Sequence, residues 1–428
     1  MSMHSRKTGI ALFVAGAAVA ALAVPENATE HYGFWIGDLN ISPYIQAGYT
    51  RDDNSSYARR QKQDIMDARS VKHDTADDYF IRPGFNLNLP GLDWTLSGDA
   101  YYDAVRYDDA EDVDNWGETL GFSGETDGGL GWRLRESVRL VDMDEDFNNY
   151  SDPSYRYSTR DRTESTFGAS LSKRITERSQ ISLGGHLGIT DYDSELLYDY
   201  RTYGGSLGYS HKLTERTDWT LSAAHSESKQ TDNSDKMDVD SKTKSSSVSL
   251  GATSHRTEHI DFNISAGIGR HEGAKRSDGK SRDNTVFTYT AGINWHGSER
   301  LTFRFYGSGR YDPAEDLDSN EIDRKSVGIS ATYRLTRRLR LSAGASYSRE
   351  EYERRVSKVT AANGNPYTTD DRGTKRDDDL YSVTGTLSYA VTDFASVYAS
   401  YSYSKTESSI DDFDYDRKRL RVGGMLRY

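Results

Sequence analysis

The sequence predicts an all-β protein: a transmembrane, antiparallel, up-and-down β-barrel of about 18 strands (16–18), with short periplasmic turns and long extracellular loops. Three observations lead to this prediction. Apolar and polar residues alternate with a period of two along most of the chain. A short polar turn motif recurs between the alternating segments. The connections fall into a short class and a long class, as expected for hairpins joined edge to edge.

The composition fits a barrel whose strands turn one face to water. Only 35% of the 428 residues are hydrophobic, and the mean hydropathy is −0.80. A barrel strand turns half of its side chains to the lumen, so this low value is compatible with a membrane protein. The absence of cysteine excludes disulfides and thiolate metal sites. The net charge of −13 argues against general nucleic-acid binding.

Residues 1–23 have the pattern of a secretory signal peptide. Arg6 and Lys7 supply the positive end, 10–19 is an apolar run, and 21–23 reads Ala-Leu-Ala, a small-x-small cleavage site. We expect 24–38 to form a short periplasmic N-terminal segment and 39–428 to form the barrel. After the signal peptide, no apolar run approaches the roughly 20 residues of a spanning helix, so the mature chain would cross a membrane as strands.

The first strands follow one another from residue 39 onward. One face of the first strand carries Ile41, Pro43, Ile45, Ala47 and Tyr49. The same alternation continues over 79–89, returns over 94–102 after the turn signal Pro-Gly, and recurs over 132–140, where arginines fill the polar positions. The intervening strand, near 116–124, has the least regular alternation.

A turn motif of the form apolar-Thr-Glu-Arg marks the later hairpins. It reads Ile-Thr-Glu-Arg at 175–178 and Leu-Thr-Glu-Arg at 213–216, and each copy precedes an alternating strand. Related copies stand at 256–259, 297–300, 335–338 and 391–394. A short polar turn between two alternating segments predicts a hairpin at each copy.

The connections on the opposite side are longer and mostly acidic, and they comprise 52–77, 142–158, 227–244, 271–283, 312–321 and 350–376. Short turns on one rim and long loops on the other are typical of an outer-membrane barrel, and an even strand number places both chain ends in the periplasm. Aromatic residues gather at both rims, as expected for two interfacial girdles. Those beside short turns are Trp94, Trp132, Trp219 and Trp295; those beside long loops are Tyr49, Tyr102, Tyr203, Tyr311, Tyr347 and Tyr403.

The last strand ends the chain on an aromatic residue. Leu420, Val422 and Leu426 form its apolar face, and Tyr428 is the final residue. This strand resembles the assembly signal of bacterial outer-membrane barrels. We expect it to pair with the first strand near 41–49, because an open strand edge leaves backbone groups without partners in hydrocarbon.

Nearly all of the chain after residue 23 resembles the outer-membrane β-barrel porins of Gram-negative bacteria, including barrels found with polysaccharide-export and exosortase systems. The residues that carry the resemblance are 39–43 (Leu-Asn-Ile-Ser-Pro), 80–85 (Phe-Ile-Arg-Pro-Gly-Phe) and the turn motifs. The resemblance implies an outer-membrane location, passage of polar solutes and a role linked to exopolysaccharide export. It transfers no functional residue.

Parity along the strands also predicts which side chains line the lumen. Arginines dominate this set and could form a ladder for anionic solutes, since guanidinium groups pair bidentately with carboxylate and phosphate. The alternative is that they pair with loop acids such as Asp312, Glu315 and Asp316. The predicted lumen-lining residues are Arg133, Arg135, Arg139, His186, Arg304, Tyr306, Arg310, Arg334, Arg340, Arg419 and Arg421.

Catalytic and metal chemistry find little support. His186 is the best inward histidine, but Ser182 lies about 13 Å away along the strand, too far for a hydrogen bond. The run Asp142, Asp144, Asp146 lacks the glycine of an EF-hand, which leaves at most a loose surface cation site that bridges lipopolysaccharide. We therefore predict no enzyme, no cofactor and no resident metal.

The function predicted from the sequence is a channel for polar solutes. The alternatives are a surface-exposed structural or adhesin-type barrel and, with less support, an acylhydrolase. The expected partners are outer-membrane lipids and lipopolysaccharide, the barrel-assembly machinery and a polar or anionic solute, with no nucleic acid.

Overall fold

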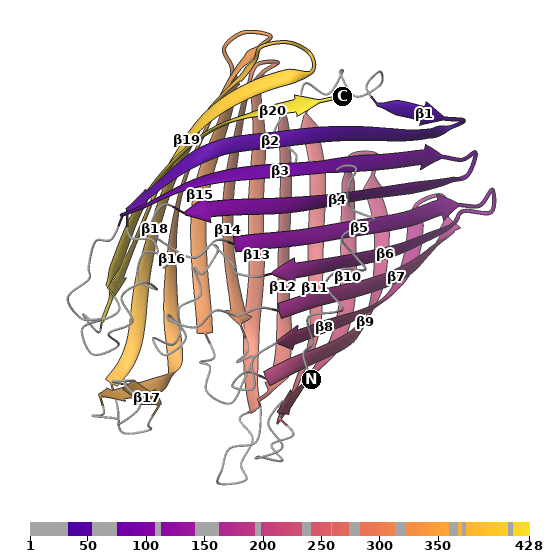
Figure 1. Ribbon diagram of the computed structural model, residues 1–428. Coiled ribbons are helices and arrows are strands. Elements are labelled where there is room, and N and C mark those ends of the chain that lie inside the picture. The colour runs from indigo at the N-terminus through magenta and orange to yellow at the C-terminus, as the bar shows by residue number, and fades with distance from the viewer. Residues whose placement is uncertain are drawn as a thin grey trace, which may run out of the picture.

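The computed structural model describes residues 33–53, 75–107, 113–141, 162–192, 198–232, 241–257, 259–273, 283–312, 322–358, 367–369, 374–409 and 414–428. Eighteen long antiparallel strands form one closed ring (Figure 1). They are β2 (Leu39–Asp53), β3 (Thr75–Pro90), β4 (Trp94–Tyr107), β5 (Val113–Glu125), β6 (Leu130–Val141), β7 (Arg162–Thr176), β8 (Ser179–Tyr192), β9 (Tyr198–Thr214), β10 (Thr217–Asp232), β11 (Ser241–Thr257), β12 (Ile260–Glu272), β13 (Asp283–Ser298), β14 (Leu301–Asp312), β15 (Ile322–Arg334), β16 (Leu339–Lys358), β18 (Thr374–Ala390), β19 (Ala395–Ser408) and β20 (Tyr415–Arg427).

The ring closes where the first long strand meets the last. β2 pairs with β20 from Tyr44 opposite Arg427 to Asp53 opposite Lys418, and we call this pairing the seam. The predicted barrel of about 18 antiparallel strands is thus confirmed. The described residues contain no helix long and apolar enough to cross a bilayer.

Two three-residue strands were not predicted. β1 (Phe34–Ile36) pairs with the start of β2, and β17 (Tyr367–Thr369) pairs with the far end of β16. β1 falls within 24–38, which was expected to carry no strand. Three residues are too few to show a period of two, so the sequence gives no signal for either strand. The predicted signal peptide and the acidic run at 142–148 lie outside the described residues.

The connections are sorted between the two rims. Turns such as 91–93, 177–178, 215–216 and 299–300 share one rim, which we call the short-turn rim. The opposite ends of the strands form the long-loop rim. The Thr or Ser of the turn motif shapes its turn, because its hydroxyl accepts a hydrogen bond from the backbone N–H two residues later. These bonds are Thr176 to Arg178 (3.2 Å), Thr214 to Arg216 (3.2 Å), Ser298 to Arg300 (3.3 Å), Thr336 to Arg338 (3.2 Å) and Thr392 to Phe394 (3.3 Å).

The two faces of each strand differ in chemistry. Leu183, Ile264 and Leu341 stand on the apolar face, with exposed fractions of 56%, 55% and 40% in the isolated chain. Their neighbours Ser265 and Ser342 occupy the other face. In a membrane barrel the apolar face meets lipid and the polar face lines the lumen, so we call them the outer face and the inner face.

Aromatic side chains cluster on the outer face near both rims. At the short-turn rim the ring of Phe122 lies between Trp94 and Trp132, at centroid distances of 5.6 and 4.4 Å. At the long-loop rim Tyr49 packs against Tyr79 at 5.3 Å. The tyrosine hydroxyl also donates to Asp77 (2.7 Å), so these rings join an apolar body to a polar partner, as interfacial aromatics do.

Candidate functional site: the inner wall of the barrel

Two parts of the inner face differ in chemistry, and we call them walls. The serine wall is the inner face of β7 to β16, and the seam wall is the inner face of β19, β20, β2, β3 and β4. The serine wall is built mainly from serine, threonine and glycine, which meet across neighbouring strands. Examples are Ser222 with Ser249 (2.7 Å), Ser265 with Thr290 (2.7 Å) and Ser326 with Ser348 (2.8 Å). These short hydroxyl side chains satisfy one another and fill little of the lumen.

The seam wall is densely packed by comparison. Gly48 and Gly423 stand directly opposite each other across the seam. Phe80 lies beside one of them and Tyr398 beside the other, and both rings are at least nine-tenths buried. A Cβ added at residue 48 would come within 2.6 Å of the Phe80 ring, and one at residue 423 within 2.8 Å of the Tyr398 hydroxyl. Gln46 reaches across the seam and donates to that hydroxyl at 2.9 Å.

Charged side chains pair across the seam on the long-loop side of the two glycines. Asp52 accepts hydrogen bonds from Arg417 (2.9 Å) and Arg419 (3.0 Å), and its side chain is only 4% exposed. Arg421 donates to the Thr50 hydroxyl at 3.1 Å, and its guanidinium lies 4.8 Å from the centre of the Phe80 ring. Asp52 therefore links two arginines of β20 to β2 across the seam.

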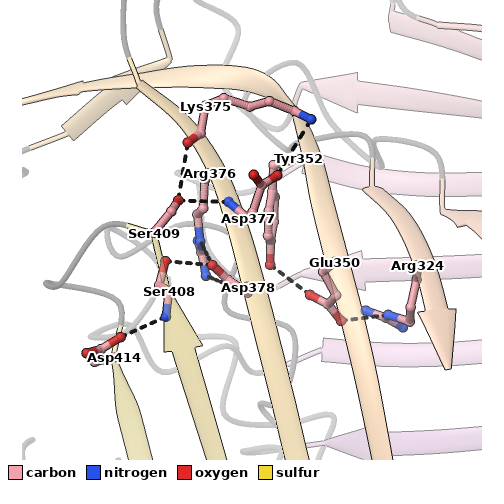
Figure 2. A network of polar contacts seen from close by, with 10 residues as sticks. All are labelled: Arg324, Glu350, Tyr352, Lys375, Arg376, Asp377, Asp378, Ser408, Ser409 and Asp414. Atoms are coloured by element: carbon pink, nitrogen blue, oxygen red, sulfur yellow. Dashed lines mark hydrogen bonds and ion pairs between the residues drawn. The ribbon is translucent and has the colours of Figure 1, made fainter. Parts of the chain in front are cut away.

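A further polar network joins the long-loop ends of β15, β16, β18 and β19 (Figure 2). Glu350 accepts from Arg324 (2.6 Å) and from the Tyr352 hydroxyl (2.9 Å). The Tyr352 ring lies 4.3 Å from the guanidinium of Arg376, which in turn pairs with Asp378. Glu350, Tyr352, Arg376 and Asp378 are all at most 5% exposed, so the network joins four strands through buried polar groups.

This network corrects the prediction that 350–376 is a loop. β16 continues to Lys358 and β18 begins at Thr374. A membrane strand needs only about 9–11 residues, so these ends extend beyond the bilayer. There both faces carry polar side chains, and the period of two is hidden. The same reason explains why Asp52, predicted to open a loop at 52–77, belongs to β2.

The predicted lumen residues share the polar face of their strands by parity, but they do not form one group. Arg139 pairs with Glu164 at 3.3 Å, whereas Arg419 and Arg421 belong to the seam wall. Arg310 and Arg340 also have partners. The rings of His186 and Tyr306 lie over Gly204 and Gly328. Arg135 lies near Asp99 and interacts with it electrostatically. The structure does not describe the side chains of Asp312, Glu315 and Asp316, the loop acids expected to pair with arginines.

Several arginines on the inner face lie close to the short-turn rim, and we call them the arginine ring. Arg334 stands directly opposite Arg340 across β15 and β16. Arg133 and Arg304 follow their turns by a few residues on β6 and β14. Arg427 stands at the end of β20, where its backbone N–H donates to Phe394 in the neighbouring turn. Among the described residues Arg133, Arg304, Arg334 and Arg427 form no ion pair. Strand parity puts Arg427 on the same face as Arg419 and Arg421, and only the pairing of β20 with β2 shows that it stands opposite Tyr44.

A histidine pair flanks a carboxylate on the same rim. His255 Nδ1 lies 2.8 Å from one oxygen of Asp261, and His296 Nε2 lies 3.4 Å from the other. The two histidines stand at the ends of β11 and β13, beside the turns. No group of three or more ligands able to hold a metal ion occurs among the described residues.

Solved structures of other barrels resemble this chain at low sequence identity. The copper transporter OprC matches with a TM-score of 0.50 and 11% identity, covering 90% of this chain and 63% of that one. The FrpB iron transporter from Neisseria meningitidis matches at 0.48 and 9%, covering 88% and 62%. The outer membrane protein OpdK from Pseudomonas aeruginosa matches at 0.45 and 12%, covering 91% and 99%. This chain therefore spans less than two thirds of the length of the two metal transporters.

Sequence comparison gives the family directly. No curated protein matches the chain. A family model does match it, over residues 28–428, which include the whole ring of strands. The chain belongs to the family described as Putative beta-barrel porin 2, a family of outer-membrane barrels.

Proposed function

We propose that the protein is an outer-membrane channel for polar solutes with a preference for anions. A ring of eighteen strands is wide enough to enclose an aqueous lumen, as barrels of 16–18 strands do. The serine wall offers that lumen many hydroxyl groups and few bulky side chains. Membership in a porin family supports the same reading.

The arginine ring is the observation that carries the anion preference. Carboxylates on the inner wall mostly have basic neighbours: Asp52 has Arg417 and Arg419, Glu164 has Arg139, and Asp261 has two histidines. Arg133, Arg304 and Arg334 have no such partner among the described residues. Fixed positive charge around one mouth of a pore raises the local concentration of anions and opposes cations.

The proposal also covers how the protein reaches the outer membrane and what surrounds it there. We infer that residues 1–23 direct export and that Leu420, Val422, Leu426 and Tyr428 present the last strand to the barrel-assembly machinery. A polar lumen with arginines would also suit a role beside the export of an acidic polysaccharide, which the family resemblance suggests. Lipopolysaccharide would surround the tyrosines of the long-loop rim.

Conductance of the full chain in a planar lipid bilayer tests this function. We expect discrete channel openings and, in a potassium chloride gradient, a reversal potential on the anion-selective side. The double variant Arg304→Gln, Arg334→Gln should shift that potential toward cation selectivity. Arg270→Gln removes an arginine from the outer face and should leave it unchanged. A folded protein without conductance would overturn the proposal and favour a structural or adhesin-type barrel.

A further inference from the structure

We propose that Arg427, Tyr44 and Arg82 form a binding site for an oxyanion on the seam wall, close to the short-turn rim. The anion is a carboxylate, phosphate or sulfate group, presented by a solute in the lumen. This inference rests on the proposed passage of anions and identifies the place where one would be held.

The strand register brings the three side chains together. Tyr44 on β2 stands directly opposite Arg427 on β20. Directly opposite residues on one face have their Cβ atoms about 4.5–5.5 Å apart. On the other side Tyr44 faces Gly84 of β3, and Arg82 lies two residues along that strand on the same face. Tyr101, which stands opposite that glycine on β4, packs against the cluster that contains Tyr44.

Three buried donor atoms in this neighbourhood have no hydrogen-bond partner: the Tyr44 hydroxyl, Nε of Arg427 and Nε of Arg82. Two acceptor atoms beside them, Oδ1 of Asp103 and Oε1 of Gln46, also have none. Tyr44 is 6% exposed, so its hydroxyl has little access to bulk water. Buried polar atoms in folded proteins nearly always have hydrogen-bond partners, so three unpartnered donors on adjacent strands point to a bound ligand. Each of the three can donate a hydrogen bond, so the ligand must offer acceptor atoms to them.

The unpaired charge of Arg427 favours a negative acceptor. Arg82 already pairs with Asp103 through its Nη2 atom, which compensates one positive charge. Arg427 is half-buried and forms no ion pair with any described residue. Asp99 is the other nearby carboxylate, and it also interacts with Arg135. An oxyanion would compensate Arg427 and accept hydrogen bonds from both guanidinium groups, whose planar forks match carboxylate and phosphate oxygens.

The other members of the arginine ring lack these features. Arg304 and Arg334 are exposed to the lumen, and no unpartnered buried atom is associated with either. We therefore infer that Arg304 and Arg334 attract anions to the rim, whereas Arg427 binds one directly. This difference supplies a matched control, because removing Arg304 deletes the same charge from the same rim.

Titration of the full-length protein in detergent with sodium sulfate tests the site, with sodium chloride at equal ionic strength as the reference. We expect saturable binding of sulfate to the wild type and a loss of at least tenfold in affinity for Arg427→Gln. Arg427→Lys keeps the charge but loses the planar fork, and should bind several-fold more weakly than the wild type. Tyr44→Phe should also weaken binding, whereas Arg304→Gln should weaken it far less than Arg427→Gln does. Sodium acetate as a second titrant separates carboxylate from sulfate recognition.

The outcomes separate this site from the channel function. Heat-modifiable migration on gels confirms that each variant is folded before it is titrated. Absence of saturable sulfate binding in the wild type would overturn the site, even if the protein conducts. Equal affinities for the wild type and Arg427→Gln would also overturn it. Sulfate binding that depends on Arg427 in a barrel that does not conduct would support the site and contradict the channel.

Discussion

The serine wall and the seam wall share one architecture, yet different parts of the chain hold their strands in register. Along the serine wall short turns join neighbouring strands, and the turn motif sets the pairing of each hairpin. The inner side chains are then free to be small. No turn joins β2 to β20, which lie at opposite ends of the barrel sequence (Figure 1). There glycine packing, the bond from Gln46 to Tyr398 and the ion pairs of Asp52 hold the pairing. Where turns cannot set the register of a sheet, buried side chains do so.

The largest expected effect comes from removing part of the seam. Deletion of 426–428 takes away Leu426, Arg427 and Tyr428, including two residues paired with Ile45 and Tyr44. We expect the truncated protein to reach the periplasm but not to insert, because the open edge has no backbone partner in hydrocarbon. Surface proteolysis and heat-modifiable migration measure insertion. Arg427→Lys, which leaves the outer face intact, should insert normally; insertion of the truncated chain at the wild-type level would contradict this role of the seam.

Asp52→Asn should cause the next largest loss. It leaves Arg417 and Arg419 without their shared carboxylate in a nearly buried position. Breaking a buried ion pair by removing one partner costs about 3–5 kcal/mol. The midpoint of urea unfolding, followed by heat-modifiable migration, measures the effect. Ser265→Ala on the serine wall is the control and should change the midpoint little; an equal shift for both variants would remove the distinction between the walls.

A third change tests the two faces of one serine-wall strand. Ile264 lies on the outer face of β12, and Ser265 lies beside it on the inner face. Arginine at a lipid-facing position near the midplane costs about 2–4 kcal/mol, so Ile264→Arg should destabilise the barrel strongly. Ser265→Arg should be tolerated because the inner face already carries polar and charged side chains. Equal unfolding midpoints for the two variants would show that the faces are wrongly assigned.

The smallest expected effect distinguishes the packing of the walls. Gly48→Ala places a methyl group against the Phe80 ring and the backbone oxygen of Val422, whereas Gly168→Ala on β7 meets no atom within 4 Å. Overpacking of a dense site costs about 1–3 kcal/mol. We expect a lower unfolding midpoint for the first variant and an unchanged one for the second. Equal behaviour would mean that the seam wall relaxes as easily as the serine wall.

The sequence predicts well whatever depends on local pattern. The period of two indicates the strands and their faces, and the recurring threonine indicates the turns, because each is set by residues within a few positions. The pairing of Asp52 with Arg417 and the approach of Tyr44 to Arg427 depend instead on the register across the seam. Parity places each of these residues on a face of its strand but does not show which residue of the neighbouring strand it stands opposite. The extended ends of β16 and β18 escaped prediction because polar residues on both faces remove the alternation.

The seam has a consequence for the order of events during biogenesis. Asp52 and Arg417 are 365 positions apart, so their bond is among the most non-local in the protein. It cannot form until the last strand is available, and until then β2 keeps an edge that other chains could pair with. An incomplete chain also retains a carboxylate whose two arginines have not arrived. Closure of the ring therefore depends on the presence of both β2 and β20, since only a chain that contains both can complete these contacts.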